Sequence, residues 1–303
     1  MIQSTNIYSY KSNFNNLNHK NSINFSGLGS TALKNVCANP KAQKRLNTYL
    51  QWYFDAYPNQ FKIFMSDLNK LSGSTDSFAF EALRKRYESF SHLPDVLNKL
   101  NLAESMRSGQ VIAAISDSLK KVCHRPSSIL DVGCGNGEIL KGLKDSYRLP
   151  YSKLTGVDVY QDTNRVPFNR LKYDGVNLAR SISDAAQSNL DISKNYDTAI
   201  LASVLHHSDD HLNLLKEVNK VMDKNGVLIV EDISPDVGFD DFHTVMDNFI
   251  SIFQKSEGSK IPANYLSFDS LKDLAAKSGF AVKDVNVYMP DVLKQFVAVL
   301  QKI

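Results

Sequence analysis

The spacing of the hydrophobic residues changes once along the chain, near Pro126. Before this point, from Lys41 on, apolar and aromatic residues recur every three or four positions, which is typical of helices with one buried face. Aromatic side chains bury large areas, so we expect these helices to pack through them and to form a lid or a dimer face. The spacing predicts helices over residues 41–57, 61–71, 78–90, 94–100 and 104–122.

After Pro126, short apolar runs alternate with helical patterns. The runs predict strands at residues 129–132, 154–158, 168–173, 198–203, 227–230, 281–288 and 295–301. A helix before the fifth strand is expected to close at Asn225-Gly226. The last two strands are joined without a helix, so they can pair only as an antiparallel hairpin. The sequence therefore predicts a doubly wound α/β fold, with a mostly parallel seven-stranded sheet that ends in an antiparallel hairpin and follows an N-terminal helical region.

Residues 1–39 differ from the rest in composition. They are rich in Asn, Ser and Lys and contain no Asp or Glu, which predicts a disordered leader. A targeting or secretion signal is the alternative, since transit peptides are also poor in acids and rich in Ser. Three parts are thus expected: the leader at 1–39, a helical lid or dimerisation region at 40–125, and an α/β domain at 126–303.

The overall composition sets wide limits on function. Of the 303 residues, 43% are hydrophobic and 22% are charged, which is ordinary for a globular protein. The net charge of +3 is too small to indicate binding to nucleic acid or to an anionic membrane. Three cysteines without metal-ligand spacing fit a reducing compartment, and no apolar run approaches the roughly 18 residues of a membrane span. We expect a cytoplasmic protein.

The first strand runs directly into a glycine-rich loop. Gly133, Gly135 and Gly137 allow the backbone to approach a ligand, and the helix that opens at Glu138 offers free N–H groups. In a dinucleotide-binding loop the third glycine would fall at Glu138, so that motif is not met. Asp131, two residues before the first glycine, favours a ligand that carries positive charge.

The second strand also ends in an acid, Asp158, about 20 residues further on, as expected of a ribose-binding carboxylate. Such a group can accept hydrogen bonds from both ribose hydroxyls. Together, the segments D-V-G-C-G-N-G and G-V-D resemble the nucleotide-binding half of class I S-adenosylmethionine-dependent methyltransferases, from about Ser128 to the C-terminus. The resemblance implies the fold and S-adenosylmethionine as cofactor, but not the methyl acceptor.

The resemblance also implies roles for residues at the strand ends. Asp131 would lie near the methionine amino group of the cofactor. Asp174 would read the adenine amino group, although a turn role before Gly175 is the alternative. The implied cofactor-binding residues are Asp131, Gly133, Gly135, Gly137, Asp158, Val159, Asp174, Gly175 and Ala202.

The segment after the fourth strand holds candidate bases. His206 and His207 lie where families of this fold place groups that face the transferred methyl, and histidine can take a proton near neutral pH. Alternatively, one histidine orders the loop while Ser208 or Asp209 caps the next helix. We predict no metal site, because a serine stands where the related metal-binding pattern needs its second histidine.

Two later segments resemble acceptor sites of small-molecule methyltransferases. One is Glu231-Asp232 after the fifth strand. The other contains His243 and Asp247, which share a helix face and either line the pocket or form an exposed pair. The predicted catalytic residues are His206, His207 and His243.

Motifs that the sequence lacks reduce the range of possible methyl acceptors. The region after the fourth strand has no Asn/Asp-Pro-Pro-aromatic segment, no cysteine, and no glutamate before Glu217, which argues against the known nucleic-acid and arginine methylation motifs. We therefore predict transfer of a methyl group from S-adenosylmethionine to a small-molecule acceptor by in-line displacement, with O-methylation favoured. The alternatives are a protein or RNA methyltransferase that docks through the basic leader, and a non-catalytic partner subunit. A homodimer through the N-terminal helices is a further prediction.

Overall fold

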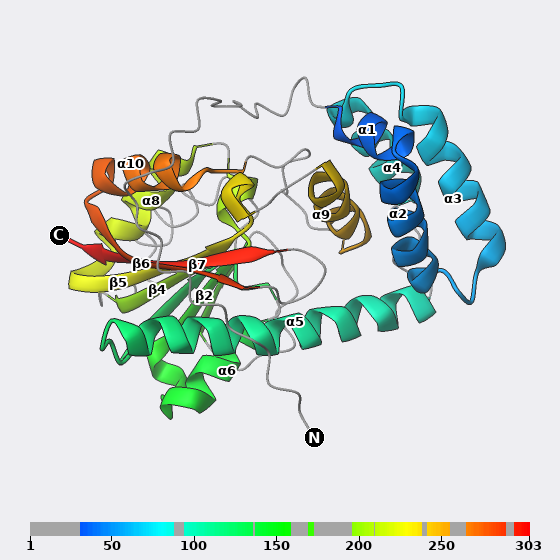
Figure 1. The fold of residues 1–303 in the computed structure, drawn as a ribbon. Helices are drawn as coiled ribbons and strands as arrows, with labels where there is room; N and C mark the ends of the chain where they lie inside the picture. Colours follow the sequence, from blue (N-terminus) through cyan, green and yellow to red (C-terminus); the bar gives the residue numbers. More distant parts are fainter. Residues whose placement is uncertain are drawn as a thin grey trace.

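A computed structural model describes residues 31–87, 94–135, 137–158, 169–172, 196–208, 210–237, 241–254, 265–288 and 294–303. They form a seven-stranded sheet with helices on both faces, and a helical region beside it (Figure 1). No helix within these ranges is long and apolar enough to cross a membrane.

The sheet has the strand order β3-β2-β1-β4-β5-β7-β6. Its first five strands pair in parallel, and β7 pairs antiparallel with both β5 and β6. This confirms the prediction of a mixed α/β fold whose sheet is mostly parallel and ends in an antiparallel hairpin. The strands are β1 (Ile129–Val132), β2 (Leu154–Asp158), β3 (Asn169–Lys172), β4 (Tyr196–Ala202), β5 (Met222–Asp232), β6 (Phe280–Tyr288) and β7 (Gln295–Lys302).

Both faces of the sheet are buried under helices. Helices α5 (Pro94–Lys121) and α6 (Glu138–Tyr147) cover one face, and α8 (His211–Lys220) and α10 (Phe268–Lys277) cover the other (Figure 1). Because successive side chains of a strand point to opposite faces, Leu228 and Val230 of β5 belong to one apolar core and Ile229 to the other. The C-terminal end of the parallel strands is left for ligands.

The helical region contains α1 (Ala32–Ala38), α2 (Pro40–Tyr53), α3 (Pro58–Leu71) and α4 (Asp76–Tyr87). It also contains α9 (Asp241–Gln254), which comes from the segment after β5 and packs against α1 and α4 (Figure 1). Phe249 of α9 lies 5.3 Å from Phe64 and 5.7 Å from Phe80 between ring centroids. The aromatic residues of these helices therefore form the core that the sequence predicted, and they share it with the C-terminal half of the chain.

The predicted leader ends too late. Helix α1 lies within residues 1–39, and its Leu33 and Val36 are buried. The buried carboxylate of Asp76 accepts the backbone N–H groups of Ala32 at 2.8 Å and Leu33 at 2.9 Å, so it caps the helix from 43 and 44 residues away. The composition of residues 1–39 alone could not indicate this helix, because the residue that caps it, Asp76, lies outside that segment. The part of the predicted leader before residue 31 lies outside the described residues.

Two element boundaries also differ from the predictions. Residues 94–121 form one continuous helix, α5, rather than two. Strand β5 begins at Met222, so Asn225-Gly226 lies inside the strand, where the pairing with β4 shifts register, and not at the end of α8. Asn225 adopts the left-handed conformation (φ 63°). This conformation occurs at irregularities in strands as well as at helix ends, so Asn225-Gly226 did not distinguish between the two.

Candidate active site

The glycine loop after β1 adopts a backbone that other residues avoid. Gly133, Gly135 and Gly137 have φ values of 79°, 50° and 81°. A Cβ atom at Gly133 would lie 2.1 Å from Cγ2 of Val204, so a side chain does not fit there. At Gly135 a Cβ would meet nothing within 4 Å, which leaves the backbone open toward a ligand.

The acid that ends β2 is tied to this loop. The Asp158 carboxylate accepts the Gly135 backbone N–H at 2.5 Å, and the Gly133 N–H donates to the Val157 carbonyl at 2.6 Å. Asp158 is nearly buried. The structure therefore brings Asp158, the predicted ribose acceptor, into direct contact with the predicted glycine loop.

Asp131 lies beneath the same loop and is 1% exposed. Among the described residues, neither of its carboxylate oxygens has a hydrogen-bond partner. Burial, and to a lesser degree the negative charge of Asp158, raise the pKa of Asp131 to about 7. A buried acid without a partner is costly, and a ligand ammonium group would supply the missing charge and donors. The residues present thus fit a cofactor with an ammonium group and a ribose.

A histidine–aspartate pair lies at the ends of β4 and β5. His206, in the short helix η3 (Leu205–His207), is buried, and its backbone N–H donates to Oδ2 of Asp232 at 3.1 Å. Its ring Nδ1 pairs with Oδ1 of the same carboxylate. The ring centroid of His206 lies 3.9 Å from that of His207 and 5.6 Å from that of Tyr265. The predicted His206 and His207 are therefore brought together, and Tyr265 was missed.

His243 is placed on α9, in the first turn, and is nearly buried. Its neighbour Phe242 belongs to the same apolar cluster as Tyr265, which packs on His206. The candidate base therefore lies where the sheet edge meets the helical region. The predicted pairing of His243 with Asp247 involves a side chain outside the described part of the structure.

A second buried carboxylate, Glu231, is held on the α5 side of the sheet. Nη2 of Arg107 lies 3.1 Å from Oε2 and 3.3 Å from Oε1 of Glu231. The hydroxyls of Tyr288 and Ser203 donate to it at 2.8 and 3.2 Å. Burial raises the pKa of Glu231, against the lowering effect of the Arg107 charge. The sequence indicated Glu231 as a strand-end acid, but nothing in the pattern of α5 singled out Arg107.

The remaining predicted cofactor residues divide into two groups. Ala202 ends β4 opposite Glu231 and is nearly buried. Three residues lie outside the described ranges: Val159, Asp174 and Gly175. Within the described ranges, no group of three or more His, Cys, Asp or Glu side chains is arranged to hold a metal ion.

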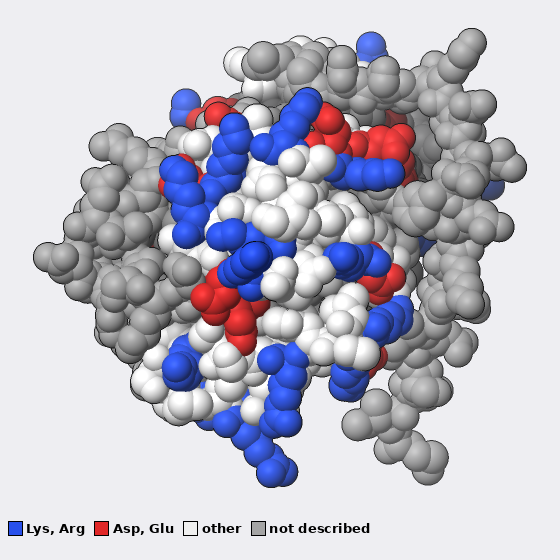
Figure 2. All heavy atoms as spheres, turned by 90° about the vertical axis from the view of Figure 1, so that its left-hand side faces the viewer, with Lys and Arg blue, Asp and Glu red and all other residues white. Residues whose placement is uncertain are grey.

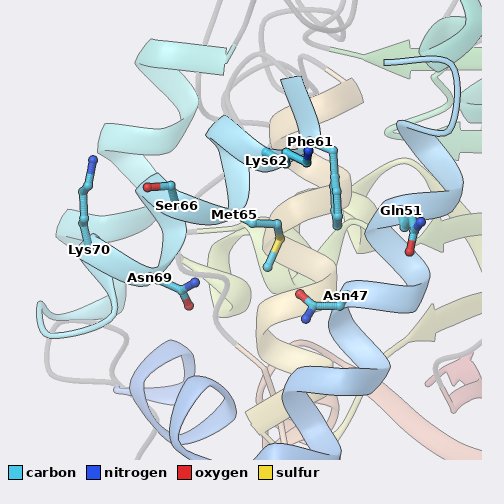
Figure 3. A pocket seen from close by; sticks show the side chains of 8 residues that line it. All are labelled: Asn47, Gln51, Phe61, Lys62, Met65, Ser66, Asn69 and Lys70. Carbon is cyan, nitrogen blue, oxygen red and sulfur yellow. The ribbon is translucent and has the colours of Figure 1, made fainter. Parts of the chain in front are cut away.

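An open hollow of about 780 Å³ lies elsewhere, between α2 and α3 (Figure 3). It contains no predicted site residue and no acid or histidine, so we assign it no role. Its lining residues are Asn47, Gln51, Phe61, Lys62, Met65, Ser66, Asn69 and Lys70.

The strand order, the glycine loop and the acids at the ends of β1 and β2 define a Rossmann-like nucleotide-binding fold of the class I methyltransferase type. The sequence profile of a family described as a methyltransferase domain matches residues 103–285, and the chain belongs to this family. The chain therefore contains a methyltransferase domain of the S-adenosylmethionine-dependent type, as predicted.

Solved structures give weaker similarities. The O-methyltransferase NcsB1 from neocarzinostatin biosynthesis, in complex with S-adenosyl-L-homocysteine and 1,4-dihydroxy-2-naphthoic acid, is 20% identical with a TM-score of 0.37, over 58% of this chain and 49% of that one. The chain thus spans about half the length of NcsB1. A possible histamine N-methyltransferase from Thermotoga maritima is 19% identical with a TM-score of 0.47, over 72% of this chain and 100% of that one.

A third such structure is magnesium protoporphyrin IX methyltransferase from Synechocystis PCC 6803, with bound S-adenosyl-L-homocysteine. It is 16% identical with a TM-score of 0.41, over 75% of this chain and 96% of that one. No curated protein matches the chain by sequence. We draw nothing about the acceptor or the mechanism from these distant similarities.

Proposed function

We propose that this enzyme methylates a hydroxyl group of a small aromatic or hydroxylated acceptor, and that His206 takes the acceptor's proton. The observation that carries the proposal is the buried pair of His206 and Asp232 at the C-terminal end of the sheet. When bound, S-adenosylmethionine supplies a methyl group that is already activated. The protein then has to position the acceptor and remove its proton.

The cofactor would be held by the loop after β1 and the acids beside it. Asp131 would pair with the ammonium group, because it is buried without a hydrogen-bond partner among the described residues. Asp158 would accept from the ribose, while the open face at Gly135 allows close backbone approach. Val159, Asp174, Gly175 and Ala202 complete the proposed set.

Asp232 prepares His206 for proton transfer. With Nδ1 of the ring donating to the carboxylate, Nε2 is the basic nitrogen, and Asp232 stabilises the imidazolium that forms when Nε2 takes a proton. The second contact, from the His206 backbone N–H to Asp232, fixes the position of the residue itself. His207 and His243 remain proposed members of the acceptor site.

The surroundings of His206 favour a flat acceptor. The rings of Tyr265 and His207 lie against it, and the apolar cluster of the helical region continues from Tyr265 to Phe242. Aromatic walls suit an aromatic acceptor, which can stack on them. The helical region would then act as the lid of the site, and its use as a homodimer contact stays a prediction.

A nucleic-acid acceptor is less favoured. On the face shown in Figure 2, Lys and Arg of the described residues are interspersed with Asp and Glu. Binding to a phosphate backbone instead needs a positive surface with few acids.

A cytoplasmic location is proposed only from the sequence. It rests on the three cysteines, which are free thiols in the structure.

A methyl-transfer screen tests the proposal. The protein is incubated with methyl-labelled S-adenosylmethionine and a panel of phenolic, catecholic and quinone-like metabolites. With an accepted compound, we expect His206→Gln to lower turnover by about 10²- to 10⁴-fold, the usual contribution of a general base.

The control is His124→Gln. His124 also bonds through its ring, at 2.8 Å to Thr198, but near the opposite end of β4. We expect this variant to keep near-normal turnover. Full turnover in His206→Gln with its pH profile unchanged contradicts the assignment of His206 as the base.

A further inference from the structure

Ser203, the residue directly after β4, has an unfavourable backbone conformation. Its φ is 54°, in the left-handed region that non-glycine residues seldom adopt. Such a conformation persists only where the surroundings impose it. Two contacts with one residue do so here: the Ser203 N–H donates to the Glu231 carbonyl at 2.8 Å, and the Ser203 hydroxyl donates to the Glu231 carboxylate at 3.2 Å.

The turn at Ser203 sets the direction of the next four residues. Val204 follows at once and packs so closely on Gly133 that a methyl group there would collide with it. His206 follows two residues later and is bound to Asp232. The segment 203–207 therefore connects the cofactor loop to the proposed base, and its position is fixed at Ser203 by Glu231 and at His206 by Asp232.

The contact of the Ser203 hydroxyl depends on the position of the Glu231 carboxylate. It is fully buried, and Arg107 brings the opposite charge to it with two contacts of 3.1 and 3.3 Å. The same Nη2 also donates to the Ser203 hydroxyl. Arg107 thus binds both members of the contact that imposes the turn.

Arg107 comes from α5, which also reaches the helical region. Near its start, Lys99 donates to the Trp52 carbonyl at 2.6 Å and pairs with Asp55. Further along, Arg107 lies at the sheet edge and Ile115 is buried under the sheet. One continuous helix therefore runs from the helical region along the sheet (Figure 1). It carries Arg107 to the turn after β4.

We infer that Arg107 is a positioning residue: its ion pair with Glu231 imposes the turn at Ser203, and the turn aligns the segment 203–207 with the cofactor loop. Alignment of the cofactor loop does not depend on which residue is the base. The consequence for His206 rests on the proposed function.

Three variants test this inference. Arg107→Met keeps most of the side-chain stem and removes the charge. Arg107→Met alone leaves the buried carboxylate of Glu231 without its charged partner, and this is the main cost of that variant to folding. The double variant Arg107→Met/Glu231→Leu removes the carboxylate as well. The control is Lys121→Met on the same helix, because Lys121 pairs with Asp284 of β6 at 3.8 Å.

Two measurements need no methyl acceptor: calorimetric affinity for S-adenosylhomocysteine, and hydrogen exchange of peptides covering residues 133–137 and 203–207. For Arg107→Met we expect affinity to fall by about tenfold or more, equivalent to about 1.4 kcal/mol, with faster exchange in both peptides. Lys121→Met should stay within about twofold of the wild type, a difference of roughly 0.4 kcal/mol.

The double variant separates positioning from stability. If Arg107 positions the turn, the melting temperature of the double variant recovers toward the wild type while affinity stays low and exchange at 203–207 stays fast. Recovery of affinity together with melting temperature would overturn the inference, and so would wild-type affinity and exchange in Arg107→Met.

These outcomes are distinct from those for the proposed base. Low affinity in Arg107→Met together with full turnover in His206→Gln would support the positioning role and reject His206. Once an acceptor is known, Arg107→Met should also lower kcat at saturating cofactor, because a misplaced segment misaligns His206, whereas a purely structural role leaves the kcat of the folded enzyme unchanged.

Discussion

Asp232 holds His206 at two points, with one carboxylate oxygen on its backbone N–H at 3.1 Å and the other on its ring Nδ1. The preceding residue, Glu231, points to the opposite face of the sheet, where it meets Arg107. Two successive acids of β5 therefore fix the segment after β4 from both faces.

Replacing Asp232 by Asn should separate orientation from binding. The backbone contact of His206 can survive, but an amide neither stabilises an imidazolium nor fixes the tautomer, so turnover should fall by about 10²- to 10⁴-fold. Affinity for S-adenosylhomocysteine, measured by calorimetry, should stay within about twofold, or roughly 0.4 kcal/mol. Asp197→Asn is the matched control, since Asp197 accepts the N–H groups of Ser127 and Ser128 near the amino end of β4. Equal turnover losses in both variants would point to general destabilisation.

The buried Asp131 should make stability depend on pH. Burial raises its pKa from 3.8 to about 7 in the folded protein, so the folded state binds the proton more tightly than the unfolded state does. Its contribution to the free energy of unfolding is therefore fully present below about pH 4, is lost between about pH 4 and 7, and is constant above. Denaturant titrations of the wild type and of Asp131→Asn, without cofactor, measure this contribution. Relative to the wild type, the free energy of unfolding of Asp131→Asn should increase as pH rises to about 7. A difference between the two proteins that does not change with pH would contradict a raised pKa at Asp131.

Asp158 should contribute to affinity more than to folding. Its carboxylate accepts the Gly135 N–H and is proposed to accept from the cofactor ribose. Hydrogen bonds to charged groups contribute about 1.5–3 kcal/mol, so Asp158→Ala should weaken S-adenosylhomocysteine binding by roughly ten- to hundredfold. Circular dichroism should show the fold retained. Unchanged affinity would mean that another residue holds the ribose.

Asp76 should stabilise the helical region through α1. Asp76→Ala leaves the N–H groups of Ala32 and Leu33 without their acceptor, at a cost of about 1–3 kcal/mol. The measurement is the melting temperature, together with limited proteolysis near residue 32. Asp241→Ala is the control, because Asp241 accepts an exposed hydrogen bond from the Asn35 side chain of the same helix, and its loss should change stability by less than about 0.5 kcal/mol. Equal effects of the two substitutions would contradict the capping role.

Some of the site could be predicted because its residues lie next to each other in the sequence. Asp131 and Gly133 are joined by the strand-to-loop turn, and Asp158 ends the next strand, so their order alone placed them at one sheet edge. Asp232 ends β5 and His206 follows the end of the neighbouring parallel strand β4, so both were also expected at this edge.

Other features depend on contacts between distant segments. Arg107 reaches Glu231 across 124 residues, and Asp76 caps a helix more than 40 residues before it. Helix α5 was predicted as two helices. In the structure its Leu102 and Met106 are exposed, so these two apolar residues do not mark the buried face of the single helix. Contacts between segments so far apart cannot be predicted from the residues on either side of each position.

We propose that this methyltransferase domain holds S-adenosylmethionine between Asp131, the glycine loop and Asp158. Isothermal titration calorimetry with S-adenosylhomocysteine, on the wild type and on Asp131→Asn at pH 6 and 8, tests it most directly. We expect wild-type binding with one site per chain that strengthens from pH 6 to 8, as Asp131 ionises through its pKa of about 7. In the variant we expect weaker binding without that pH dependence, and in both proteins no heat with NAD. Heat with NAD and none with S-adenosylhomocysteine would contradict it.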